Sequence, residues 1–154
     1  MNDPAALYQR IVLDHNRAPR NFRIVRPCTH HAEVLNPVCG DRITLYLDVR
    51  NARIEDIGFQ GDACAIATAS ASLLTDVLRQ RSAAEARALA RAFEQQLAGH
   101  AGEGDRLEPL QPLLQVREYP GRLKCVLLPW YALEAALNGD VAHTVSSATD
   151  ADAG

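Results

Sequence analysis

The sequence predicts an α+β domain in which a small three-stranded antiparallel sheet packs helices on one face. Two observations lead to this class. Apolar residues recur at helical spacing before residue 20 and after residue 61, whereas between residues 32 and 59 they alternate with polar residues in the period of a strand. The 154 residues, 47% of them apolar, suffice for one core, so we expect a single domain over residues 1–139. Residues 140–154, rich in Ser, Thr, Ala and Asp, are expected to be a disordered tail.

The first helix is predicted to begin at Asp3-Pro4, because a capping carboxylate followed by proline is a frequent helix start. It should close within residues 17–21, a segment that contains a proline. The dipeptide Asn51-Ala52 is the expected two-residue turn between the second and third strands. The three strands cover residues 32–36, residues 43–49 and a segment that ends at residues 57–59.

The chain after Gly61 is predicted to be mainly helical. One helix ends near Arg79, and the next opens with a capping box over residues 82–85. Residues 99–105 hold three glycines and are expected to be a loop, and two prolines limit the following segment to a short helix at best. The last helix is predicted over residues 122–137, with Pro129 either kinking it or marking its true start.

Composition excludes several classes of function. Sixteen Lys and Arg against nineteen Asp and Glu give a formal net charge of −3, which argues against a nucleic-acid-binding domain. No apolar run approaches the roughly 18 residues of a membrane span, and residues 1–4 resemble no signal peptide. We therefore expect a cytoplasmic protein whose four cysteines are reduced thiols rather than disulfides.

Three of the four cysteines lie at predicted element boundaries. Cys39 lies in a tight turn with a potential second ligand, Asp41, two residues later. Cys64 lies in the first turn of a helix, where unpaired N–H groups favour a thiolate, and Cys125 lies at another predicted helix start, beside two cations. Cys28 lies near two histidines but has no such setting, and we interpret it as a bystander.

The alternative, purely structural interpretation is that each cysteine serves as a small buried hydrophobic residue. The separations of 25 residues from Cys39 to Cys64 and 61 residues from Cys64 to Cys125 match no compact zinc knuckle. Spacing alone is therefore weak support for a metal site, and the sequence around each thiol carries the inference.

Four linked motifs resemble the NifU/IscU-type iron–sulfur cluster assembly proteins. The resemblance runs from about Leu7 to Leu137 and implies the fold of that family's scaffold domain. The stretch between the second and third motif cysteines is long and lacks the Leu-Pro-Pro-Val-Lys motif of the IscU type, and Lys124 stands where that type has a histidine. Both departures resemble the SufU branch. The motifs are residues 7–21, Asn36-Pro-Val-Cys-Gly-Asp41, residues 64–72 and Arg122-Leu-Lys-Cys125.

The resemblance implies one metal site formed by Cys39, Asp41, Cys64 and Cys125. Such a set suits a resting Zn²⁺, or alternatively iron or a transient [2Fe–2S] cluster. It also implies two kinds of partner: a SufS-like cysteine desulfurase that supplies persulfide sulfur, and apo iron–sulfur proteins that accept the product. Cys39 is the expected persulfide acceptor, and Cys125 is the alternative.

Two other functional classes remain open at this stage. The first is a zinc protein whose metal only holds the fold, with no sulfur transfer. The second is a cysteine hydrolase, but no histidine lies near any of the three thiols in sequence. The leading prediction is iron–sulfur cluster assembly, either as a zinc-dependent sulfurtransferase or as a cluster carrier.

Overall fold

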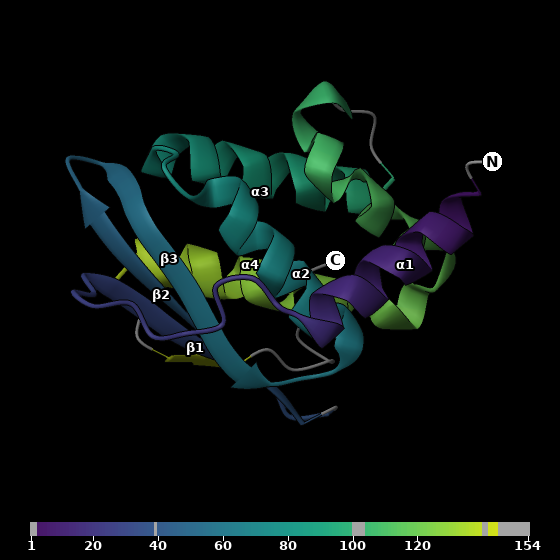
Figure 1. The fold of residues 1–154 in the computed structure, drawn as a ribbon, viewed down its shortest axis with the longest axis horizontal. Helices are drawn as coiled ribbons and strands as arrows, with labels where there is room; N and C mark the ends of the chain where they lie inside the picture. The colour runs from purple at the N-terminus through teal and green to yellow at the C-terminus, as the bar shows by residue number, and fades with distance from the viewer. Residues whose placement is uncertain (1–2, 39, 100–103, 140–141, 145–154) are drawn as a thin grey trace.

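A computed structural model describes residues 3–38, 40–99, 104–139 and 142–144 (Figure 1). The elements in chain order are α1 (Pro4–Arg17), β1 (His30–Asn36), β2 (Asp41–Arg50), β3 (Arg53–Asp62), α2 (Ala65–Leu78), α3 (Ala83–Leu97), the 3₁₀ segments η1 (Gly104–Glu118) and η2 (Pro120–Arg122), α4 (Leu123–Leu137) and β4 (Ala142–Thr144). The predicted α+β class is confirmed.

The sheet has the strand order β3-β2-β1-β4. The three predicted strands pair antiparallel, β1 with β2 and β2 with β3. The hairpin between β2 and β3 turns at Asn51 and Ala52, whose φ angles of 53° and 63° are those of the tight turn that suits strand twist. Burial along β2 alternates, with Ile43, Leu45 and Leu47 inside, which confirms that one face of the sheet is covered.

The helices cover that face: α4 packs against β1 and β2, and α2 packs against β3. A buried serine joins the two helices. Ser70 on α2 donates a hydrogen bond to the carbonyl of Val126 on α4 (2.6 Å) and accepts one from the Trp130 indole (3.1 Å). This contact holds the second turn of α2 against the first turn of α4, because Ser70 is the sixth residue of α2 and Val126 is the fourth residue of α4.

Both helix starts predicted from capping residues are confirmed. Asp3 caps α1 by accepting a hydrogen bond from the Ala5 amide (3.1 Å), and Ser82 and Glu85 form the reciprocal capping box of α3. The last helix begins at Leu123 and continues through the buried Pro129, so this proline does not mark its start.

Two features differ from the prediction. The segment after the loop is a long run of 3₁₀ turns, Gly104–Glu118, rather than a short helix. Its two prolines are compatible with such turns, because a missing N–H costs less where the hydrogen-bond ladder is already irregular.

The second difference is β4, which lies within the predicted disordered tail. Residues Ala142–Thr144 pair parallel with β1 and add a fourth strand at the edge of the sheet. The other residues of that tail lie outside the described part of the chain. No helix among the described residues is long and apolar enough to cross a bilayer.

Candidate metal centre

Asp41 is the first residue of β2 and is only 6% exposed. Its Oδ1 atom accepts a hydrogen bond from the Cys64 amide (3.1 Å), whereas its Oδ2 atom is buried without a hydrogen-bond partner. A buried polar atom without a partner is uncommon and costs about 1–3 kcal/mol. The second oxygen of this carboxylate is therefore available for a ligand.

The turn that precedes Asp41 is shaped by Asn36. Its side-chain oxygen accepts a hydrogen bond from the Val38 amide (3.2 Å), and its carbonyl accepts one from the Gly40 amide (2.8 Å). Gly40 has a φ of 78°, a conformation that favours glycine. Cys39, the predicted persulfide acceptor and metal ligand within this turn, lies outside the described residues.

Cys64 is the N-cap residue of α2, and its sulfur accepts a hydrogen bond from the Ala67 amide (3.4 Å). The pKa of Cys64 is lowered to about 7, first by a hydrogen bond with the Cys125 thiol and then by backbone amides of the first helical turn, against the opposing effect of burial. The negative charge of Asp41 raises the same pKa. The thiolate expected at this helix start is thus favoured by the Cys125 contact and by the helix amides.

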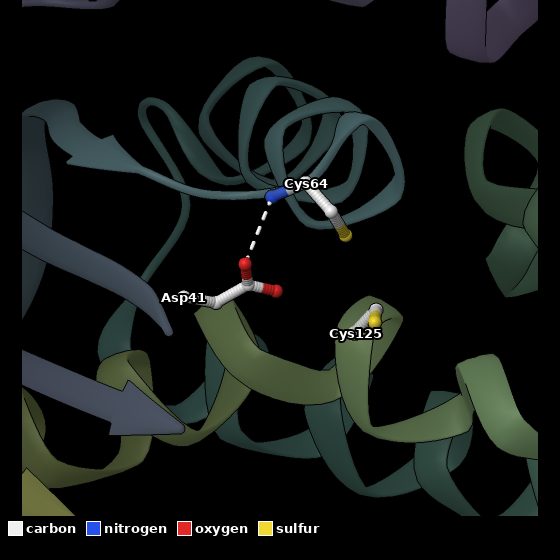
Figure 2. Close-up of side chains that lie close together, drawn as sticks. All are labelled: Asp41, Cys64 and Cys125. Atoms are coloured by element: carbon white, nitrogen blue, oxygen red, sulfur yellow. Dashed lines mark hydrogen bonds between the residues drawn. The ribbon is translucent and has the colours of Figure 1, made fainter. Parts of the chain in front are cut away.

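Cys125 lies in the first turn of α4 and is 3% exposed. Ligand atoms of Asp41, Cys64 and Cys125 all lie within 4.8 Å of one another. Figure 2 shows these three side chains converging from three separate elements, with the hydrogen bond between Asp41 and the Cys64 amide. No other trio of potential ligands meets this criterion among the described residues.

The chemistry of this donor set fits a thiophilic cation. Two thiols and a carboxylate oxygen without a partner match the ligand types of Zn²⁺ and of iron in sulfur clusters. The negative charge of Asp41 raises the pKa of Cys64, and a bound cation would offset the repulsion between this carboxylate and a Cys64 thiolate.

The other sequence candidates lie apart from this cluster. Cys28 is exposed and donates a hydrogen bond to the His30 carbonyl (3.2 Å), so it takes no part in the trio. His15 is buried on α1, where its Nδ1 atom lies 2.7 Å from the Ser72 hydroxyl. This contact gives His15 a packing role between α1 and α2.

The fold and the site thus define a small α+β domain in which two thiols and a carboxylate, gathered at one end of the sheet, could hold a metal ion. The chain matches the family described as the NifU-like N terminal domain over residues 7–106. It belongs to that family.

Two relatives and one solved structure are similar to this chain over most of its length. The chain is 36% identical over 132 residues to the iron–sulfur cluster assembly scaffold protein IscU of Streptococcus pyogenes serotype M1, covering 85% of this chain and 82% of that protein. It is 32% identical over 129 residues to the zinc-dependent sulfurtransferase SufU of Bacillus subtilis (83% and 87%).

The fold is also similar to a crystal structure from Fervidobacterium islandicum AW-1, described as an iron–sulfur cluster assembly scaffold protein for the SUF system. That comparison gives a TM-score of 0.81 at 30% identity and covers 86% of this chain and 97% of the other. The predicted family is confirmed by sequence and by fold.

Proposed function

We propose that this protein accepts persulfide sulfur from a cysteine desulfurase at a zinc site formed by Cys39, Asp41, Cys64 and Cys125. The observation that carries the proposal is the convergence of Asp41, Cys64 and Cys125, with one carboxylate oxygen left without a partner. The relatives named for iron–sulfur scaffolding and for zinc-dependent sulfur transfer support it.

Bound zinc would hold the cysteine sulfurs as thiolates and protect them from oxidation. The protein's own residues supply the rest. Asp41 and the amides at the start of α2 orient the Cys64 side of the site, and the Cys64–Cys125 contact favours the thiolate.

Sulfur transfer is then a thiol–persulfide exchange. An acceptor thiolate attacks the terminal sulfur of the desulfurase persulfide, a new sulfur–sulfur bond forms on the acceptor cysteine, and the desulfurase cysteine leaves as a thiolate. No net oxidation occurs. Cys39 is favoured as acceptor over Cys125, because its neighbours Val38 and Gly40 are exposed whereas Cys125 is buried.

The decisive experiment measures sulfide release by a cysteine desulfurase supplied with cysteine and a reductant, with and without this protein. We expect the wild-type chain to accelerate release and Cys39→Ser to abolish the acceleration. Cys28→Ser is the matched control, because Cys28 is an exposed thiol outside the cluster, and it should behave as wild type.

A purely structural zinc site gives a different result. In that case Cys39→Ser lowers the melting temperature, but desulfurase turnover is the same with and without the protein. The cluster-carrier version has its own test: anaerobic iron and sulfide should produce sulfur-to-iron charge-transfer bands that Cys39→Ser removes. Zinc and iron contents of the purified chain then separate the two resting states.

A further inference from the structure

Tyr8, on α1, has a buried hydroxyl that bonds to nothing among the described residues. The side chain is 7% exposed and belongs to the hydrophobic core. A buried phenol usually finds a hydrogen-bond partner, and leaving its O–H without one is destabilising. Tyr8 is thus a donor held in place without an acceptor.

The face of α1 that carries Tyr8 is fixed against α2. His15 follows Tyr8 by seven residues, close to two helical turns, so both lie on one face of α1. The His15 ring is anchored to α2 through the Ser72 hydroxyl (2.7 Å). Beyond α1, the Asn21 amide donates to Thr75 on the same helix (3.0 Å). The face of α1 that carries Tyr8 is therefore held against α2.

The other side of the Tyr8 ring faces the entry into α4. It stacks on the Tyr119 ring, with centroids 6.3 Å apart and planes 23° apart. Tyr119 directly precedes η2, which leads into the helix that carries Cys125. The phenol thus lies between the segments that deliver the two described thiols.

Electrostatics agree with this location. Burial raises the pKa of Tyr8, Tyr119 raises it further, Arg122 lowers it, and the charges of Cys64 and Cys125 raise it. The Tyr8 phenol consequently stays protonated at neutral pH and can act as a hydrogen-bond donor.

We propose that the Tyr8 hydroxyl is a positioning residue that donates a hydrogen bond to sulfur held at the Cys64–Cys125 pair. This inference rests on the proposed function, because it assigns a neighbour to the same site. An O–H donor withdraws electron density from a thiolate, so it tempers the nucleophilicity of that sulfur and restricts its orientation. A thiolate sulfur of the metal-loaded site would be the acceptor that the orphan hydroxyl lacks.

The test compares wild type, Tyr8→Phe and Tyr119→Phe, each loaded with Co²⁺ for spectroscopy and with Zn²⁺ for alkylation. Tyr119→Phe is the matched control, because it removes a hydroxyl from the other ring of the same stack. We expect Tyr8→Phe to move the sulfur-to-cobalt charge-transfer band to longer wavelength and to increase alkylation of the zinc-bound thiolates several-fold. Tyr119→Phe should match wild type in both measurements.

Four results would overturn the inference. If Tyr8→Phe matches wild type in band position and alkylation rate, the hydroxyl does not touch the sulfur. If both variants shift equally, the ring pair rather than the Tyr8 hydroxyl is responsible. If wild type binds neither metal through its thiolates, the proposed function fails and this inference fails with it. A change in melting temperature alone, with an unmoved band, indicates a structural role and also counts against the proposal.

Discussion

Asp41→Asn separates what this side chain does for the fold from what it does for a bound metal. Asparagine keeps the oxygen that accepts from the Cys64 amide at 3.1 Å and replaces the orphan Oδ2 atom by an NH₂ group. In the metal-free protein, that group can donate to the neighbouring thiols. The variant therefore removes a buried carboxylate oxygen without a partner, a feature that costs about 1–3 kcal/mol.

The expected effect of Asp41→Asn on the free energy of unfolding changes sign when zinc is added. Without metal, we expect Asp41→Asn to raise the free energy of unfolding by about 1 kcal/mol, the lower end of that range. With zinc, the variant loses an anionic ligand, and a zinc affinity about tenfold weaker removes about 1.4 kcal/mol of metal-dependent stabilisation when zinc is in excess. Wild type should thus gain more from zinc than Asp41→Asn.

The assay is urea unfolding with excess zinc and with a chelator, together with zinc affinity by chelator competition. Asp48→Asn is the matched control, because Asp48 is a second buried carboxylate on β2 (5% exposed) that pairs with Arg50 at 3.3 Å. It should lower stability equally in both conditions. An Asp41→Asn variant that binds zinc as tightly as wild type would contradict this prediction, and so would one that destabilises the metal-free chain as much as Asp48→Asn does.

Three further outcomes follow from individual side chains. In the metal-free protein, the rate of alkylation of Cys64 should be half-maximal near pH 7. Cys125→Ala should move that midpoint to higher pH, because the Cys125 thiol is the first cause of the lowered Cys64 pKa. An unchanged midpoint would contradict this cause. Gly61→Ala should cost about 2 kcal/mol or more in urea unfolding, because its Cβ would lie 2.2 Å from a backbone oxygen of β2, whereas Gly121→Ala meets nothing within 4 Å and should be neutral. Burial lowers the pKa of His15 below its ordinary value of about 6.5. The stability that the neutral His15 ring contributes is therefore complete above about pH 6.5 and is lost as the pH falls below that value. His15→Gln should flatten this part of the pH profile of unfolding.

Much of the fold follows from local patterns in the sequence. The alternation of Ile43, Leu45 and Leu47 predicts the covered face of β2, and the capping residues predict where α1 and α3 begin. The strand β4 could not be predicted this way. Its three residues are too short to show a period, and its pairing with β1 depends on a neighbour more than a hundred residues earlier.

The candidate site could be predicted only in part. Local sequence separated Cys64 and Cys125 from Cys28, because helix starts have recognisable residues, but separation along the chain says nothing of distance in space. The convergence on Asp41 is a result of the folded structure. Tyr8 was missed for a different reason: in the sequence it is one member of an apolar helical stripe, and nothing there shows that its hydroxyl has no partner.

The site also has a consequence for chain entropy. Its described ligands come from positions 41, 64 and 125, so a shared ion would close one loop of 23 residues and another of 61. Closing loops of this size restricts the unfolded chain much as a cross-link does, with a cost that grows only slowly with loop length. Unlike a disulfide, this link opens by ligand exchange, so a partner that takes over one ligand would release a long stretch of chain from its constraint without any redox chemistry.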